Sequence, residues 1–582
     1  MPSRFTLYQS AKEPVPLKTW AWNLYGPGVE NIGRDGKPEI IEIPQSSADQ
    51  LLVRIDTVGL CFSDVKLIQQ GGSHPKLCNR NLARNPTRLG HEVSLTVIKV
   101  GKKLKTQFSP GQRYTIQPDI HQQGKSTAYG YTIPGGLCQF HLIGPEILSA
   151  DAGSYLLPVS EGLSYAEVAL TEPWACVEAA YTQRRRLLPK AGGTMWILGN
   201  PDDVTDYMFS SGLEAPTTIV ATDIPASLMN LIVKEIDAAS VSLIERNGLT
   251  TKNYPILCDE FTNGLGFDDI VLLNPRSSRT VSEAIKLTAR RGTFNIVGHT
   301  ALDGPVTVDV GRIHYDYIAY IGTHGPDIAA SYGETRNRCE LRAGGTALFV
   351  GAGGPMGQMH VQRAIELADG PTQILATDIN PMRLKTIEER FTALAEENGK
   401  RLAAFNPETA DETLYDFVMR RTNLHGADDV IVSVPSAELM AESACVMKPD
   451  GMLVLFAGVP NGTVAPLDMS PVYLQNAQFT GTSGSKIADQ ENIIHQALNR
   501  RLSPIRSVAA IGGLDAALDG IHAMIEGRFP GKIVIFPQLR DLPLIGLTDL
   551  KVRLPDIAPY LAPGDVWTAD AEQVLIEKYW TP

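Results

Sequence analysis

The sequence predicts an α/β protein in which a doubly wound parallel sheet occurs twice in tandem. The first observation behind this prediction is an internal repeat. Three pairs of segments match in the same order along the chain: 217–232 (TTIVATDIPASLMNLI) with 372–387 (TQILATDINPMRLKTI), 266–275 (GFDDIVLLNP) with 426–435 (GADDVIVSVP), and 320–325 (YIGTHG) with 479–484 (FTGTSG). Each copy has the size of one domain, so we interpret the middle of the chain as a tandem duplication.

The second observation is the alternation of strand and helix patterns within each copy. In the second copy, TALFVG at 346–351 has the composition of a buried strand; a glycine turn and the helical stretch QMHVQRAIELA follow, and QILATD is the next strand. This βαβ order is typical of a Rossmann-type doubly wound sheet. We therefore expect Rossmann-type domains at 187–342 and at 343–500.

The rest of the chain is expected to form a further domain. It would consist of residues 1–186 and a return segment, 501–540, that ends in the strand KIVIFP. Residues 541–582 form an extension with several prolines, for which the sequence indicates no function.

Composition is that of a large globular protein. With 582 residues, 43% of them hydrophobic and 20% charged, the chain can build several cores, and global disorder is excluded. A net charge of -12 argues against a nucleic-acid-binding protein, which would carry a basic excess. Seven cysteines lack paired spacing, and the first ten residues lack the apolar core of a signal peptide. We therefore expect a soluble, cytoplasmic protein with reduced thiols and no membrane span.

Residues with zinc-ligand side chains follow one another on short turns of the amino-terminal region. Cys61 lies in VGLCFSDVK, His91 and Glu92 lie in LGHE, and Glu172 lies in LTEPWACVEAA. A catalytic zinc needs about three protein ligands and an open fourth position. One thiolate, one imidazole and one carboxylate meet this need and lower the positive charge of the site.

The sequence motifs that contain these residues resemble those of the zinc-dependent medium-chain dehydrogenases. The resemblance is to the sorbitol dehydrogenase branch in particular, and to sugar-phosphate enzymes such as the L-sorbose-1-phosphate reductases. Further similar segments are GQRYTIQPDI (111–120), GYTIPGGLCQF (130–140) and VAAIGGLDAALDG (508–520). The resemblance covers residues 1 to about 185 and about 343 to 540. It implies a mostly β, GroES-like catalytic domain with one catalytic zinc. The family's structural zinc would need four clustered cysteines, which this sequence lacks.

The resemblance also assigns roles near the zinc ligands. It implies that the Ser63 hydroxyl passes on the substrate's proton. Asp64 is suited to orienting His91 or to capping a helix. Either Glu92 or Glu172 could be the third ligand, and the sequence does not separate the two. Lys66 stands where other alcohol dehydrogenases carry a relay histidine.

Lys66 is a poor proton shuttle at neutral pH but a good point charge for an anionic substrate. It belongs to a basic stretch made up of Lys66, Lys76, Arg80, Arg84 and Arg88, with His74 among them. Such a stretch suits a phosphorylated sugar; the alternative is a solvated basic loop.

A glycine turn in the second copy predicts the cofactor site. GAGGPMG follows a strand and opens a helix, so its backbone N–H groups can hold a pyrophosphate. The residues of this turn are Gly351, Gly353, Gly354, Pro355, Met356 and Gly357, and the role of each glycine is left open. Asp378 ends the next strand, where a carboxylate accepts hydrogen bonds from ribose hydroxyls. NAD is therefore favoured over NADP.

The first copy has lost this pattern. Its turn is GNPDDVTD at 199–206, with aspartates where a diphosphate would sit. Asp223 persists opposite Asp378, and we interpret it as a turn cap. We further hypothesise that the two copies pack as an internal pseudo-dimer through 320–325 and 479–484, because exposed sheet edges need a partner. The chain itself could be a monomer or a homo-oligomer.

Together these patterns predict a zinc-dependent, NAD-linked dehydrogenase that interconverts a secondary alcohol and a ketone of a polyol, sugar or sugar phosphate. Two alternatives remain. One is a catalytically silent relative with an interaction or regulatory role, and the other is a zinc-free quinone or enoyl reductase of the same fold. The partners expected are a small-molecule substrate and neither nucleic acid nor membrane.

Overall fold

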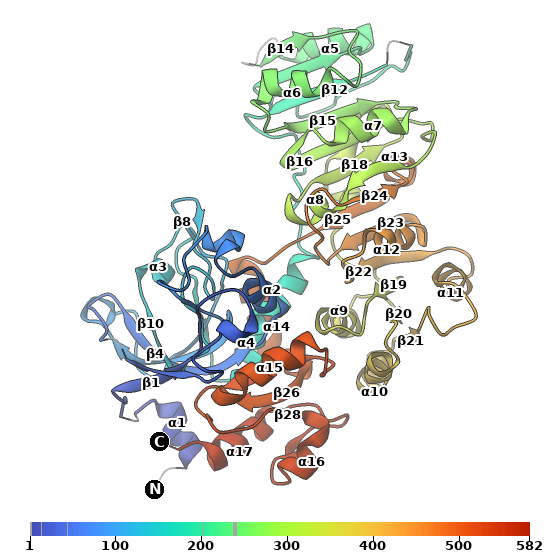
Figure 1. Ribbon diagram of the computed structural model, residues 1–582. Helices are drawn as coiled ribbons and strands as arrows, with labels where there is room; N and C mark the ends of the chain where they lie inside the picture. The colour runs from blue at the N-terminus through green and yellow to red at the C-terminus, as the bar shows by residue number, and fades with distance from the viewer. Residues whose placement is uncertain (1–2, 13, 44, 201, 237–240, 582) are drawn as a thin grey trace. The chain divides into compact units, whose positions relative to one another are not determined.

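The computed structural model describes residues 3–12, 14–43, 45–200, 202–236 and 241–581. The chain divides into two compact units (Figure 1). The first unit consists of Met1–Ala179, Gly354–Met359 and Gly484–Pro582, and the second of Ala180–Gly353 and His360–Ser483. Within the described residues we find no helix with the length and apolar character of a membrane span.

The first unit is organised by a sheet that has eight strands in the part of the chain described. Its order is β11 (Leu156–Val159), β7 (Arg113–Ile116), β6 (Glu92–Val100), β4 (Leu51–Gly59), β27 (Lys532–Phe536), β26 (Val508–Gly513) and β28 (Ile545–Gly546), with β10 (Phe140–Ile143) pairing with β4 beside this path. Every residue of β4 is buried, because its leucine and β-branched side chains fill both faces.

The register of β4 places three chain segments at one edge of the sheet. β4 ends at Gly59, which pairs with Glu92 at the start of antiparallel β6. On the other side, Gly59 pairs with Val534 of β27, so the first residue of β27, Lys532, lies just beyond the end of β4. The end of β4 and the starts of β6 and β27 therefore meet.

Helices cover this sheet. The other main elements of the first unit are α1 (Arg4–Ser10), β1 (Lys18–Ala21), β2 (Asn23–Leu24), β3 (Glu39–Glu42), α2 (Phe62–Gln70), β5 (Thr87–Arg88), β8 (His121–Gln122), β9 (Lys125–Ser126), α3 (Pro145–Leu148), α4 (Tyr165–Ala179), α14 (Ile487–Leu498), α15 (Ala517–Ile525), α16 (Leu550–Arg553) and α17 (Ala569–Tyr579). Nearly every side chain of α4 is buried, as expected for a helix that is apolar on all sides. It packs against β4, β6 and α14.

α14 lies in the first unit, although the sequence-based boundary at residue 500 would put it in the second Rossmann-type domain. Gln490 of α14 donates hydrogen bonds to Thr115 and Thr171 at 3.1 and 3.2 Å. These contacts join α14 to β7 and α4. The extension 541–582 also lies in the first unit, where β28 pairs with β26.

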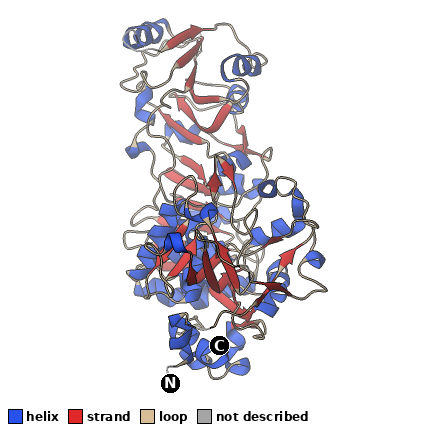
Figure 2. Cartoon of the chain, turned by 90° about the vertical axis from the view of Figure 1, so that its left-hand side faces the viewer, coloured by secondary structure: helices blue, strands red, loops and turns tan. Residues whose placement is uncertain are grey.

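The second unit contains one sheet with twelve strands among the described residues. Its order is β14 (Ser242–Glu245), β13 (Thr218–Thr222), β12 (Thr194–Leu198), β15 (Phe267–Leu273), β16 (Thr288–Val297), β18 (Ala319–Thr323), β25 (Gln478–Gly481), β23 (Met447–Leu455), β22 (Ala427–Val432), β19 (Thr346–Val350), β20 (Gln373–Thr377) and β21 (Arg401–Phe405). We call the first six strands in this order the first half-sheet and the last six the second half-sheet. Figure 2 shows helices to either side of these strands.

The two half-sheets have the same topology in mirrored order. Numbered along the chain, the strands of each follow the order 3-2-1-4-5-6 of a doubly wound sheet, and neighbours within each half-sheet are parallel. The accompanying helices are α5 (Ala226–Ile236), α6 (Tyr254–Thr262), α7 (Ser278–Ile285) and α8 (Val310–Tyr315) in the first, and α9 (Pro355–Glu366), α10 (Pro381–Glu397), α11 (Leu414–Arg421), α12 (Ala437–Ala444) and α13 (Ser470–Leu474) in the second.

The half-sheets meet at the edge that the repeat predicted. β18 pairs antiparallel with β25 through Tyr320 and Phe479, which confirms the expected edge contact. Beside it, β17 (Val306–Asp309) pairs antiparallel with β24 (Val464–Leu467). Tyr320 and Phe479 belong to one apolar cluster with residues from both half-sheets, so the two share a core.

Each half-sheet also carries the same ion pair between an arginine and a buried aspartate. Arg186 lies 2.9 Å from Asp269, and Arg338 lies 2.5 Å from Asp429. Both carboxylates are fully buried and stand at matching positions of β15 and β22. The matching backbone donors to these carboxylates are the N–H groups of Lys190 and Arg342.

Candidate metal and cofactor sites

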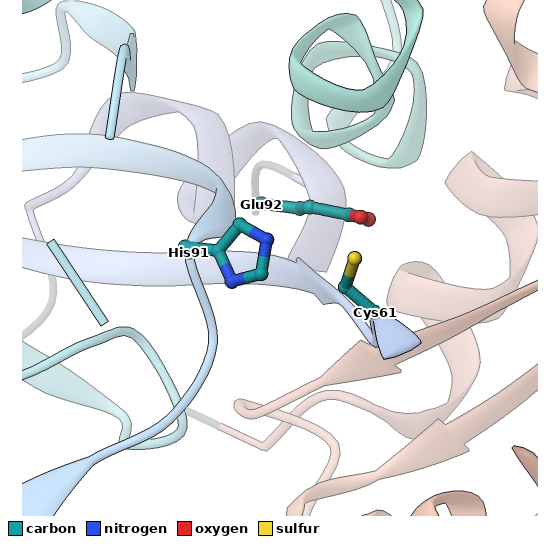
Figure 3. Close-up of side chains that lie close together, drawn as sticks. All are labelled: Cys61, His91 and Glu92. Carbon is teal, nitrogen blue, oxygen red and sulfur yellow. The ribbon is translucent and has the colours of Figure 1, made fainter. Parts of the chain in front are cut away.

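Cys61, His91 and Glu92 lie together at the sheet edge where β4 ends (Figure 3). One potential ligand atom of each lies within 4.8 Å of the others. Cys61 follows β4 and caps α2, while His91 and Glu92 enter β6. His91 and Glu92 are buried and Cys61 is partly buried.

Glu92 is held at one oxygen and has no hydrogen-bond partner at the other. Its Oε1 lies 2.5 Å from Nζ of Lys532, an ion pair with both side chains buried. In the described part of the chain, its buried Oε2 has no hydrogen-bond partner. Gly59 leaves the space for this carboxylate, because a Cβ there would collide with it. A buried oxygen of this kind, beside a thiol and an imidazole, fits a cation.

Asp64 organises the turn that carries Cys61. Its carboxylate accepts hydrogen bonds from the backbone N–H of Cys61 at 3.1 Å and of Gly90 at 3.3 Å. Its Oδ1 also lies 3.4 Å from Nδ1 of His91. Burial lowers the pKa of His91, but the charges of Asp64 and Cys61 raise it, and the result is well above the usual value. Asp64 thus caps α2, and its carboxylate lies beside the His91 ring; its role in orienting that ring stays a prediction.

Ser63 and Lys66 occupy different surroundings on α2. Oγ of Ser63 lies 3.5 Å from Sγ of Cys61, so this hydroxyl adjoins the ligand group. Lys66 is exposed one turn further along α2. Its charge helps to lower the pKa of His74, after the effects of burial and of Lys76.

Glu172, the other candidate ligand, comes from α4 and is buried beside the group without joining it. Burial raises its pKa to about 7; the charge of His91 opposes this shift, and Glu92 and Asp119 add to it. Sγ of Cys176 lies 3.9 Å from Oε1 of Glu172. Burial raises the pKa of Cys176 well above its usual value, which favours a neutral thiol over a ligand thiolate.

Sequence reasoning missed Lys532. Its place as the first residue of the apolar segment KIVIFP was a signal, because a lysine inside an otherwise buried strand needs an anionic partner. The pair of Lys76 and Asp119, 2.5 Å apart, was also missed. Nζ of Lys76 lies 4.7 Å from the centre of the Tyr131 ring.

Most of the basic side chains in the stretch before His91 form ion pairs or hydrogen bonds with other residues of the protein. Lys76 pairs with Asp119, Arg80 donates to the carbonyls of Asn85, Pro86 and Thr132, and buried Arg88 donates to Sγ of Cys138 at 3.2 Å. Lys66 and Arg84 remain exposed. The stretch is therefore not one open basic loop, and the charge available to an anionic substrate is smaller than the sequence suggested.

The glycine turn of the second half-sheet lies between β19 and α9, as predicted. Gly351 has a φ of 75°, a conformation that favours glycine, and a Cβ at Gly353 would collide with Asp378 and Arg383. The backbone N–H of Gly353 donates to Asp378 at 2.9 Å. Gly354 precedes α9, whose first residues include Pro355, Met356 and Gly357.

The corresponding turn of the first half-sheet differs in more than its glycines. In the described residues no helix lies between β12 and β13, so this turn lacks the helix N-terminus that holds a pyrophosphate. Asp203 accepts hydrogen bonds from Thr205 and Tyr207 within the turn. Asp223 accepts one from the backbone N–H of Gly248 at 2.9 Å, in line with the predicted turn cap.

Comparison with known proteins shows that the region around the ligand group matches a protein family. Residues 47–178 match the alcohol dehydrogenase GroES-like domain. This segment, which holds Cys61, His91, Glu92 and Glu172, is a GroES-like domain of the alcohol dehydrogenase type.

Two curated relatives extend the similarity beyond this GroES-like domain. L-sorbose 1-phosphate reductase of Klebsiella pneumoniae is 28% identical over 324 residues, which cover 53% of this chain and 75% of the relative. Mannitol-1-phosphate 5-dehydrogenase of Aliivibrio fischeri is 28% identical over 332 residues, which cover 54% and 76%. Among solved structures, 2R,3R-butanediol dehydrogenase of Bacillus subtilis is similar with a TM-score of 0.49 and 15% identity, covering 89% of this chain and 99% of that one. The domain and the relatives support an oxidoreductase of the alcohol dehydrogenase family.

Proposed function

We propose that the protein is a zinc-dependent, NAD-linked dehydrogenase that interconverts a secondary alcohol and a ketone of a polyol, sugar or sugar phosphate. The observation that carries this proposal is the group of Cys61, His91 and Glu92, with a buried carboxylate oxygen that has no hydrogen-bond partner among the described residues. The proposed substrate class is supported by the names of the two relatives, an L-sorbose 1-phosphate reductase and a mannitol-1-phosphate 5-dehydrogenase. One zinc is expected per chain.

Cys61, His91 and Glu92 would hold the zinc, which supplies Lewis acidity for the alcohol oxygen, while a bound nicotinamide exchanges the hydride. Ser63 adjoins Cys61 and can take the proton of the hydroxyl and pass it on. Asp64 fixes the Cys61 turn and the His91 ring. Glu172 contributes a second buried carboxyl at the same site, where it can hold or accept a proton.

The test of this function combines metal analysis with an activity screen. Purified protein should contain about one zinc per chain and should oxidise members of a panel of polyols, sugars and their phosphates with NAD. Zinc without turnover on any panel member would favour the catalytically silent alternative. Turnover of a quinone or enoyl substrate without zinc would favour the zinc-free reductase.

We also propose that the two half-sheets are a tandem duplication of a Rossmann-type domain, packed as an internal pseudo-dimer. The mirrored strand order and the repeated Arg–Asp ion pairs support it. Only the second copy, with the glycine turn and α9, is proposed to bind NAD. For the first domain we keep the sequence-based range 187–342; the second, predicted as 343–500, we end before α14, which lies in the first unit.

NAD binding should depend on Asp378 and not on Asp223. Replacing Asp378 by alanine removes the proposed acceptor for the ribose hydroxyls and the partner of the Gly353 N–H. Hydrogen bonds to a charged group contribute about 1.5–3 kcal/mol, so NAD affinity should fall roughly 10- to 100-fold. Asp223→Ala is the matched control and should leave affinity unchanged in a titration of NADH fluorescence. Equal losses, or two NAD molecules per chain, would contradict the assignment.

The pseudo-dimer predicts a specific pattern of amide exchange. Within the part of the chain that the structure describes, strands β17 and β24 pair with each other, across the two half-sheets, and with no further strand. If the half-sheets stay packed in solution, amides of Val306–Asp309 should exchange slowly with deuterium, whereas those of β14 at the outer edge should exchange fast. Fast exchange throughout β17 and β24 would show that the half-sheets separate.

A further inference from the structure

The extension at the carboxyl end of the chain is bound to the first unit at several points. Trp567 is fully buried and packs near Phe536 of β27, with 6.4 Å between ring centres. Trp580 is also buried and meets Tyr8 of α1 edge to face at 5.0 Å. These two aromatic anchors flank α17 and fix its position.

From α17, Glu572 reaches the beginning of α4. Its two carboxylate oxygens accept hydrogen bonds from the backbone N–H groups of Tyr165 at 2.5 Å and Ala166 at 2.9 Å. These are the first residues of α4, and the first N–H groups of a helix have no partner within it. A local residue, Ser164, caps only the N–H of Glu167, at 3.2 Å. The extension therefore supplies the cap that α4 lacks locally.

Glu572 makes these hydrogen bonds while 2% exposed. Burial raises its pKa to about 7, although the two N–H groups, Arg113 and Trp567 lower it. A carboxyl group buried in this way is costly, and the N-terminus of α4 is the feature that offsets the cost through hydrogen bonds and the helix dipole.

The same helix carries Glu172 about two turns further along. Pro173, which has no N–H, follows Glu172 inside α4, so the helix lacks one backbone hydrogen bond at this point. The segment from Tyr165 to Glu172 is consequently tied less firmly to the rest of α4. Its position therefore depends more on the contacts of its first turn: Glu572 accepts from the N–H groups of Tyr165 and Ala166, and the Thr57 hydroxyl donates to the Tyr165 carbonyl at 2.7 Å.

We propose that Glu572 is a positioning residue for the active site: through the first turn of α4 it sets where the Glu172 carboxyl stands beside Cys61, His91 and Glu92. This inference rests on the proposed zinc site. It gives the extension 541–582 a function, because α17 delivers the cap and the two tryptophans hold α17.

The chain offers a matched control on the same helix. Glu577 of α17 accepts hydrogen bonds from the backbone N–H groups of Arg4 and Phe5 at 3.1 and 2.7 Å. It thus caps α1 as Glu572 caps α4, but α1 carries no residue of the proposed site. Glu577 is more exposed than Glu572, so unfolding by urea is measured for both variants to compare their stability.

The experiment compares the full-length wild type with Glu572→Ala, Glu572→Gln and Glu577→Ala. Zinc affinity is measured by competition with a chelator, and the ligand geometry by the visible spectrum after exchange of zinc for Co²⁺. Glu572→Ala should weaken zinc about tenfold, shift the Co²⁺ bands and lower kcat more than it changes KM. Glu572→Gln, which keeps the volume and one acceptor oxygen, should have a smaller effect in the same direction. Glu577→Ala should leave zinc affinity and spectrum unchanged.

Two outcomes separate this inference from the proposed function. If the wild type binds zinc and Glu572→Gln matches Glu577→Ala in affinity, spectrum and kcat, Glu572 has only a structural role and the inference is wrong, even if Glu572→Ala fails to fold. If the wild type itself binds no zinc or Co²⁺, the zinc site fails, and the inference fails with it.

Discussion

Replacing Cys61 by alanine should remove the metal and the activity together. Cys61 is the only thiol in the ligand group formed by the described residues, and it stands on a turn held by Asp64. Without it, two ligands remain where about three are needed. Because a catalytic zinc contributes several kcal/mol to transition-state stabilisation, turnover should fall by at least about a thousandfold.

The measurement is zinc content by atomic absorption alongside the initial rate with NAD. Cys78→Ser is the control, because Cys78 is an exposed thiol outside the ligand group. It should keep about one zinc per chain and the wild-type rate. Full activity in a zinc-free Cys61→Ala protein would rule out the proposed mechanism.

Replacing Lys532 by methionine should destabilise the metal-free protein by about 3–5 kcal/mol, because it leaves the Glu92 carboxylate buried without its cation. Burial lowers the pKa of Lys532, but Glu92 and Cys61 raise it above its usual value, so the lysine stays charged at neutral pH. Added zinc should restore part of the stability, because it supplies another positive charge beside Glu92.

Urea unfolding of chelator-treated protein measures this effect. In the double variant Lys532→Met with Glu92→Gln no unpaired charge remains, so it should be more stable than Lys532→Met alone. Lys551→Met is a control for loss of an exposed ion pair: Lys551 lies 3.5 Å from Asp565 on the surface, and its loss should cost at most about 1 kcal/mol. Equal losses of stability from Lys532→Met and Lys551→Met would contradict this prediction, because they would show that the Glu92 carboxylate does not need its buried cation.

The sequence predicted what lies within short motifs. Cys61, His91 and Glu92 come together because their motifs stand at the paired ends of two neighbouring strands. The contact between β18 and β25 could also be predicted, because 320–325 and 479–484 are matching segments and an exposed sheet edge needs a partner.

Partners that are distant in sequence could not be predicted. Lys532 reaches Glu92 only because β27 pairs with β4, and Glu572 reaches α4 only because α17 packs in the first unit. The charges of Arg80 and Arg88 were visible in the sequence, but their acceptors were not. Likewise, the sequence of the turn after β12 did not reveal that, among the described residues, no helix lies between β12 and β13.

The pairing of β18 with β25 within one chain has a consequence for how the protein can change by mutation. When two identical subunits pair along such an edge, every substitution occurs on both sides of the junction. Here Tyr320 and Phe479 are encoded separately, so each side can be altered alone. The turn after the first strand of one half-sheet can therefore change while the corresponding turn of the other stays as it is, an asymmetry that a symmetric pair of identical chains cannot acquire.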